Sequence, residues 1–126
     1  MILRTGVDLI EISRVSAVIT RHGKHYLNRI YTDAELEQYG QNAESLAGRF
    51  AAKEAVAKAL GTGIGDVKWK DIEILGDEQN APVITLRGAA ERTAKKLGLN
   101  EWSVSISHSE SHAIAITVAI GQKKSC

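Results

Sequence analysis

The 126-residue sequence has a single cysteine, no long apolar run and almost no net charge. Cys126, the last residue, cannot form an internal disulfide, which is typical of proteins in a reducing cytoplasm. A formal net charge of +1 indicates no general attraction to nucleic acid or membranes, so an anionic partner would have to bind a local patch. The N-terminus lacks a signal-peptide pattern, and no segment is long enough to span a bilayer. We therefore expect a soluble, cytoplasmic protein.

Several common catalytic motifs are absent as well. No G-x-S-x-G sequence marks a serine hydrolase, and one terminal cysteine without an HExxH pattern argues against zinc. The glycine pattern matches neither the P-loop nor the dinucleotide fingerprint. The whole sequence has 44% hydrophobic and 25% charged residues, which is an ordinary composition for a globular protein. Its length predicts a single domain over residues 1–126.

The residue pattern predicts an α+β fold, in which a mainly antiparallel sheet packs on a long central helix. The first strand, over residues 2–9, is apolar enough to be buried and ends on the polar Asp8. Thr32 to Glu35 form a capping box, and Gly61 is expected to end the long helix. Further strands are expected over 71–75, 82–86, 102–108 and 113–120, and helices over 11–21, 26–30, 33–39, 43–60 and 88–97.

The long helix carries charges on a stripe where apolar residues would be expected. Phe50, Glu54 and Lys58 are four residues apart and share this stripe, which is flanked by alanines. A carboxylate among Phe and Ala is costly to bury unless a cation or metal compensates it. The alternative is an ordinary Glu-Lys pair, four residues apart, on a solvated face.

Asp8 is the second acidic candidate. It is either an ordinary cap or turn acid, or one of two carboxylates that form a Mg²⁺ site together with Glu54. Mg²⁺ keeps several waters and often completes its coordination shell with substrate phosphates, so two carboxylates suffice. The sequence alone does not show that the two residues meet.

Possible anion ligands surround this pair. The glycines of Gly61-Thr62-Gly63 let backbone N–H groups approach an anion, although taken alone they are more typical of a plain helix end. Arg49, Lys53 and Lys58 could enclose a diphosphate and its metal, or could be surface residues. His108 continues the apolar row of Val104 and Ile106 at the end of a strand, and is either a half-buried hairpin residue or a phosphate ligand at a cleft edge.

Two arginines stand out in the first helical region. Arg14 and Arg21 are seven residues apart and therefore lie on one helix face. They belong either to a solvated face or to a docking surface for an acidic protein.

Taken together, these segments resemble the holo-acyl-carrier-protein synthases, the small 4′-phosphopantetheinyl transferases of bacterial fatty acid synthesis. The resemblance rests on Gly6–Arg14 (GVDLIEISR), Leu46–Ala55 (LAGRFAAKEA) with Lys58, Gly61–Gly63 (GTG) and Ser105–Ser109 (SISHS). These motifs occur in the family's order, in a chain of the family's length. The joint occurrence of the Asp8 and Lys53-Glu54 motifs is what makes the resemblance specific.

The resemblance implies transfer of 4′-phosphopantetheine from coenzyme A to a serine of apo-acyl carrier protein, with release of adenosine 3′,5′-bisphosphate. Asp8 and Glu54 would bind Mg²⁺. Glu54 would act as general base, directly or through a metal-held water, and Lys58 would stabilise or protonate the departing phosphate. The implied coenzyme A contacts are Asp8, Arg49, Glu54, Lys58, Gly61, Thr62, Gly63 and His108.

The resemblance also implies partners. Arg14 and Arg21 would contact acidic side chains of the carrier protein, and the chain would form a homotrimer with active sites between subunits. The chain departs from the family in the turn over residues 40–44, which lacks the Lys or Arg that many relatives use to hold the 3′-phosphate of coenzyme A. A non-catalytic binding module and a metal-dependent phosphatase of small nucleotides are the competing hypotheses.

Overall fold

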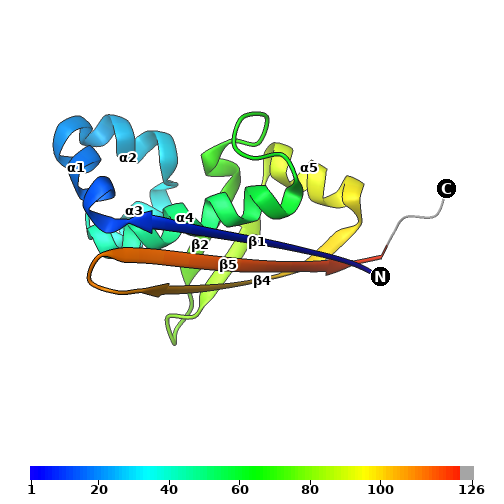
Figure 1. The fold of residues 1–126 in the computed structure, drawn as a ribbon. Helices are drawn as coiled ribbons and strands as arrows, with labels where there is room; N and C mark the ends of the chain where they lie inside the picture. The colour runs from blue at the N-terminus through cyan, green and yellow to red at the C-terminus, as the bar shows by residue number, and fades with distance from the viewer. Residues whose placement is uncertain (123–126) are drawn as a thin grey trace.

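Two antiparallel sheets and one long helix form the framework of the computed structural model, which describes residues 1–122 (Figure 1). Cys126 lies outside the described residues. One sheet has the order β1 (Ile2–Glu11), β5 (His112–Gly121), β4 (Leu99–His108), and the other pairs β2 (Ile72–Gly76) with β3 (Pro82–Leu86). The helices are α1 (Ile12–His22), α2 (Lys24–Ile30), α3 (Asp33–Tyr39), α4 (Ala43–Leu60) and α5 (Gly88–Leu97), with a 3₁₀ turn η1 (Trp69–Asp71). The predicted α+β fold is confirmed.

Helix α4 lies along the inner face of the three-stranded sheet because both surfaces carry small residues (Figure 1). The inward residues of β5 include Ala113, Ala115 and Ala119, all buried. Gly6 of β1 permits the closest approach, since a Cβ built on it would lie 1.8 Å from the carbonyl oxygen of Ala55 in α4. The backbone of β1 is therefore packed directly against the backbone of α4.

The predicted helix signals at Thr32 and Gly61 are present, and Asn42 forms a cap that was not predicted. The side chain of Asn42 accepts a hydrogen bond from the N–H of Ser45 at the start of α4, and Gly61 ends the helix in the left-handed region. The capping box between Thr32 and Glu35 is present with both of its hydrogen bonds. These local signals set where the helices begin and end.

The prediction for the first strand was wrong in two respects. β1 continues to Glu11 because it pairs with β5 along its whole length, so Asp8 lies within the strand opposite Ala115. The strand is also only half buried, because alternate residues such as Leu3 and Leu9 face away from α4. Apolar residues on both faces made it resemble a buried strand. Strand β4 likewise begins at Leu99 rather than Trp102.

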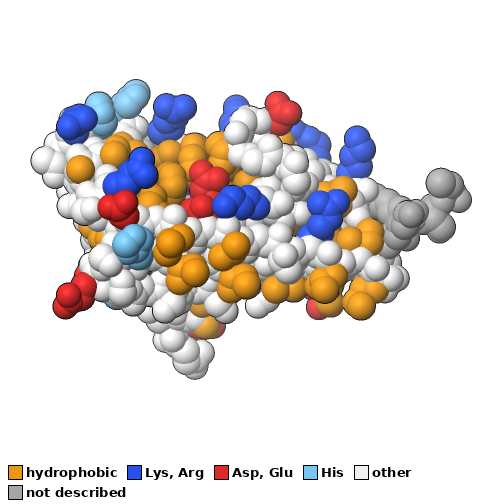
Figure 2. Space-filling model, viewed as in Figure 1, with side chains coloured by type: hydrophobic (Ala, Val, Ile, Leu, Met, Phe, Trp, Pro, Cys, Tyr) orange, Lys and Arg blue, Asp and Glu red, His pale blue; other side chains and the backbone are white. Residues whose placement is uncertain are grey.

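On the side of the three-stranded sheet that faces away from α4, strands β1 and β5 carry exposed apolar side chains. We call this surface the apolar outer face; its side chains are 36–61% exposed and comprise Leu3, Val7, Leu9, Ile114, Ile116 and Val118. Hydrophobic side chains along the strands are visible in Figure 2. No helix among the described residues is long and apolar enough to cross a membrane.

Candidate active site

Asp8 and Glu54, far apart in sequence, line the same cavity of about 310 Å³. Asp8 comes from the inner side of β1 and Glu54 from α4, and Arg14 of α1 borders the same space. Carboxylate side chains next to a Lys or Arg side chain are visible in the middle of the face in Figure 2. The remaining wall is apolar and aromatic, formed by Ile10, Val15, Val18, Tyr26 and Phe50. The structure thus brings the two predicted acids together, which the sequence alone does not show.

The electrostatic environment of Glu54 disfavours its negative charge. Burial raises the pKa of the Glu54 carboxyl, the nearby Asp8 raises the pKa further, and Lys58 partly opposes both effects. Lys58 Nζ lies 3.3 Å from Asp8 Oδ1 and donates a 2.9 Å hydrogen bond to the carbonyl of Val7. Among the described residues no ion pair joins Lys58 to Glu54, so the simple Glu-Lys pair on a solvated helix face is not what forms.

The donor set suits Mg²⁺. Two carboxylates from separate elements face one cavity, and an added cation would relieve the repulsion that raises the pKa of Glu54. In residues 1–122 no group of three or more His, Cys, Asp or Glu side chains comes together, so a structural zinc site with four protein ligands has no candidate there. An ion that keeps several waters and accepts phosphate oxygens fits these two residues.

The Gly61–Gly63 segment lies at the C-terminal end of α4 and acts as a helix end. The N–H groups of Thr62 and Gly63 both donate to the carbonyl of Ala57, and that of Gly61 donates to Lys58. These N–H groups close the helix and do not form an open anion-binding nest. Contact of this segment with coenzyme A stays a prediction.

Arg49 and Lys53 do not face the cavity, and for Lys53 the prediction of an anion ligand was wrong. Lys53 is fully buried and pairs with Glu35, 2.8 Å away. Arg49 is 7% exposed, stacks over the ring of Tyr39 and hydrogen-bonds to its hydroxyl, and its Nε has no partner. Glu54 is five positions after Arg49, so the two lie about 140° apart around the helix.

His108 lies near the other end of α4. Its side chain is 50% exposed, and its Nε2 lies 3.7 Å from a carboxylate oxygen of Glu44 in the first turn of the helix. Because α4 has 18 residues, His108 and Gly61 are close to opposite ends of a helix about 27 Å long. One chain therefore does not bring all the predicted coenzyme A ligands together.

The two arginines predicted to meet a carrier protein are both exposed on α1. Arg14 borders the cavity with Asp8 and Glu54, whereas Arg21 lies in the last turn of the helix. The sequence did not single out Tyr26 as a wall of the cavity. Its position depends on how α2 packs, which no local pattern reveals.

Comparison with known proteins agrees with this geometry. Residues 4–117 match the family model described as "ACPS: 4'-phosphopantetheinyl transferase superfamily". A holo-[acyl-carrier-protein] synthase of Herpetosiphon aurantiacus is 46% identical over 126 residues, covering 94% of this chain and 99% of its own.

Solved structures are similar too. The Helicobacter pylori holo-[acyl-carrier-protein] synthase in complex with coenzyme A superposes with a TM-score of 0.84 at 34% identity, covering 92% of this chain and 99% of its own. The holo-(acyl-carrier-protein) synthase from Bacillus anthracis, in complex with CoA (3',5'-ADP), has a TM-score of 0.77 at 32% identity, covering 94% and 96% of the two chains. From the matched residues, the curated relative and these neighbours, we conclude that the chain belongs to the 4′-phosphopantetheinyl transferase superfamily.

Proposed function

We propose that this protein transfers 4′-phosphopantetheine from coenzyme A to a serine hydroxyl of apo-acyl carrier protein. The products are holo-acyl carrier protein, for fatty acid biosynthesis in the cytoplasm, and adenosine 3′,5′-bisphosphate. The observation that carries the proposal is the meeting of Asp8 and Glu54 in one cavity, with Lys58 against Asp8. It is supported by 46% identity to a holo-[acyl-carrier-protein] synthase over nearly the whole chain.

Asp8 and Glu54 would hold one Mg²⁺ between β1 and α4. When bound, the ion neutralises negative charge that develops on the diphosphate as the phosphoanhydride bond breaks. Both carboxylates approach the cavity from elements fixed by backbone packing at Gly6, so little rearrangement is needed to present them.

Glu54 and Lys58 have different roles in the transfer step. Glu54 takes the proton of the carrier serine as that oxygen forms its bond to phosphorus. The bond from the same phosphorus to the bridging oxygen then breaks, and Lys58 donates a hydrogen bond or a proton to the departing phosphate. In the metal-free protein, burial and the nearby Asp8 raise the pKa of Glu54, so its carboxylate then accepts a proton more readily than that of an exposed glutamate.

The carrier protein would approach over α1. Arg14 lies beside the cavity and Arg21 is exposed further along the same helix, so acidic side chains on a partner would guide its serine toward Glu54. Charges at such a rim act mainly on the encounter rate and its salt dependence.

Self-association, as a homotrimer, would complete the site. The apolar outer face offers six partly exposed side chains that a second copy would cover. His108 and Gly61, near opposite ends of α4, could contact a single coenzyme A if neighbouring subunits contributed them. Arg49, with its unpaired Nε, and Thr62 and Gly63 belong to the same predicted set of contacts.

The test is to incubate the protein with apo-acyl carrier protein, coenzyme A and Mg²⁺, and to weigh the carrier by mass spectrometry. We expect the carrier to gain one phosphopantetheine group, and Glu54→Gln to abolish this gain while remaining folded. Glu37→Gln, an exposed glutamate on α3, is the matched control and should remain active. An active Glu54→Gln protein would contradict the assigned base and metal ligand. Binding without a mass gain would indicate a non-catalytic module, and hydrolysis of coenzyme A alone a phosphatase.

A further inference from the structure

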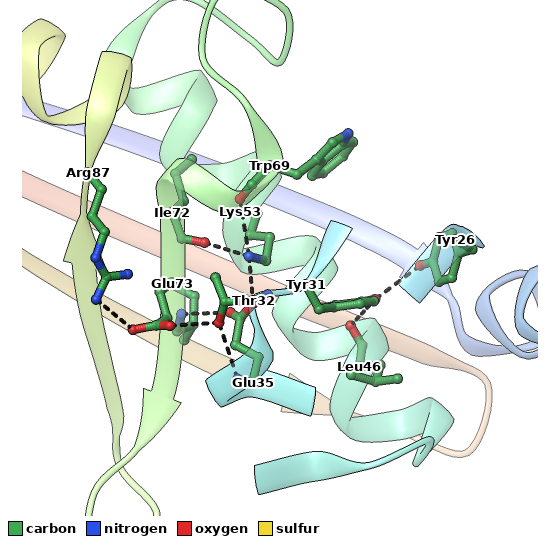
Figure 3. Close-up of polar contacts among 11 residues, drawn as sticks. Tyr26, Tyr31, Thr32, Glu35, Leu46, Lys53, Trp69, Ile72, Glu73 and Arg87 are labelled. Carbon is green, nitrogen blue, oxygen red and sulfur yellow. Dashed lines mark hydrogen bonds and ion pairs between the residues drawn. The ribbon is translucent and has the colours of Figure 1, made fainter. Parts of the chain in front are cut away.

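A buried ion pair lies on the side of α4 that does not face the cavity (Figure 3). Lys53 of α4 and Glu35 of α3 are both 0% exposed, with 2.8 Å between Nζ and Oε1. Lys53 Nζ also donates to the carbonyl oxygens of Trp69, at 3.2 Å, and Ile72. A lysine ammonium has three N–H donors, so each donor of Lys53 has an acceptor. The side chain is held from three directions.

Glu35 is held as firmly as its partner. Its Oε1 accepts from the N–H of Thr32 at 2.9 Å, and its Oε2 accepts from the N–H of Ile74 at 2.8 Å. The hydroxyl of Thr32 in turn donates to Glu73. The Lys53–Glu35 pair therefore ties four segments together: α3, α4, η1 and β2.

The same contacts reach the wall of the cavity through two aromatic pairs. Trp69, whose carbonyl accepts from Lys53, stacks its ring on Phe50 with 4.7 Å between ring centroids, and Phe50 lines the cavity. The hydroxyls of Tyr31 and Tyr26 lie 3.0 Å apart, and Tyr26 lines the cavity as well. Lys53 Nζ lies 5.8 Å from the ring centroid of Tyr31. Figure 3 shows this succession of side chains from the ion pair toward Tyr26.

Stability alone gives little reason for such an arrangement. Removing two charges from water costs several kcal/mol per ion, so a well-packed apolar pair of similar volume is often as stable as a buried ion pair. An apolar pair would, however, leave the orientation of η1 relative to α4 less closely defined. The advantage of the charged pair over an apolar pair is therefore that its directional contacts define the orientation of η1 relative to α4.

We propose that Lys53 and Glu35 are positioning residues of the candidate active site: their ion pair fixes η1 and α3 on α4, so that the Phe50–Trp69 stack and Tyr26 form the wall beside Glu54. The inference rests on the proposed function for its kinetic consequence, but not for its structural one. Lys53 directly precedes Glu54 in α4, so restraint of Lys53 also limits rotation of the helix that presents Glu54.

The experiment replaces both charges at once, in Lys53→Met/Glu35→Gln, because a single buried charge without its partner strongly destabilises a fold. The sequence has two tryptophans, so a Trp102→Phe background leaves Trp69 as the sole tryptophan, which is excited selectively at a wavelength that tyrosine does not absorb. Acrylamide quenching and the emission maximum of Trp69 then report the Phe50–Trp69 stack without any enzymatic reaction. Transfer kcat and KM are measured at a temperature at which circular dichroism shows the variant folded.

The matched control is Thr117→Val, which removes another fully buried polar group. Its hydroxyl donates to the carbonyl of Ser103 at 2.9 Å, within the sheet and outside the Lys53 network. We expect the double variant to expose Trp69 to quencher and to lower kcat about 100-fold, with a smaller change in KM for coenzyme A. Thr117→Val should keep both the Trp69 signal and kcat.

A folded double variant with unchanged Trp69 quenching and kcat would overturn the proposal, as would an equal loss of kcat in Thr117→Val. Where this double variant does not fold, Lys53→Gln/Glu35→Gln removes both charges and keeps hydrogen-bonding groups at both positions, and no change in either readout would overturn the proposal. If the unsubstituted protein transfers nothing, the proposed function fails, while the Trp69 readout still tests the positioning role.

Discussion

The close approach of β1 to α4 at Gly6 makes the substitution Gly6→Ala informative about the site. The added Cβ would lie 1.8 Å from the carbonyl oxygen of Ala55, whereas ordinary contacts begin at 3.4 Å. The oxygen is a backbone atom and the backbone fixes the position of the Cβ, so no side-chain rotation can relieve the overlap, and β1 and α4 would have to separate by about 1.6 Å. Asp8 lies on the same face of β1 as Gly6, and Glu54 directly precedes Ala55. The separation of β1 from α4 would therefore increase the distance between the carboxylates of Asp8 and Glu54.

Gly6→Ala is expected to reduce the transfer rate far more than it reduces stability. Overpacking of this kind costs about 1–3 kcal/mol, which lowers the melting temperature by roughly 4 °C per kcal/mol. Misplacement of a catalytic group by about 1 Å can cost about 100-fold in rate, so transfer kcat should fall by that order while most of the protein stays folded. Melting curves and single-turnover assays on the same sample check both values.

Two other glycines serve as controls for Gly6→Ala. Gly65 has nothing within 4 Å of its Cβ position, so Gly65→Ala should change neither stability nor rate. In Gly121→Ala the new Cβ would meet the carbonyl oxygen of Gly98 at 1.8 Å, the same overlap at the far end of β5. It should destabilise the protein without lowering kcat of the folded fraction. A folded Gly6→Ala protein with unchanged kcat would refute the claim that this contact sets the distance between the carboxylates.

Three further substitutions test the remaining parts of the account. Burial and Asp8 raise the folded-state pKa of Glu54, so its ionised form destabilises the metal-free protein at neutral pH, and this cost disappears below the pKa of the unfolded state. In EDTA, Glu54→Gln should therefore have a higher melting temperature than the unsubstituted protein at neutral pH but not at acid pH. Equal melting temperatures at every pH would contradict this. The double variant Arg14→Glu/Arg21→Glu should raise KM for the carrier protein several-fold and weaken its salt dependence. The control Lys95→Glu/Lys96→Glu on α5 changes the net charge by the same amount, so an equal effect there would point to net charge alone. The side chains of the apolar outer face are 36–61% exposed, and burying them would stabilise the assembly by about 1 kcal/mol per side chain, or roughly 6 kcal/mol per subunit. Ile116→Lys should therefore sediment as a monomer in sedimentation velocity. A trimer that survives this substitution would argue against this interface.

Much of the fold could be predicted because its signals are local. The capping box at Thr32, the glycine after α4 and the spacing of Phe50, Glu54 and Lys58 each depend on residues within a few positions of one another. The stripe on α4 was informative for the same reason. A carboxylate among alanines needs a compensating charge wherever the helix packs.

The parts that could not be predicted depend on contacts between distant segments. Lys53 looked like an anion ligand because its partner Glu35 lies in another helix and only the fold brings them together. β1 looked buried because the sequence does not show that one side of the sheet stays uncovered. The meeting of Asp8 and Glu54 likewise needed the register of β1 on α4, which the backbone contact at Gly6 sets.

The central claim is that Asp8 and Glu54 form one Mg²⁺-dependent transfer site. The most direct test is to weigh apo-acyl carrier protein after incubation with coenzyme A and the enzyme, with Mg²⁺ or with EDTA, for the unsubstituted protein, Asp8→Asn and Glu54→Gln. We predict a gain of one phosphopantetheine group only for the unsubstituted protein with Mg²⁺. Transfer in EDTA, or by either folded variant at the unsubstituted rate, would contradict the account.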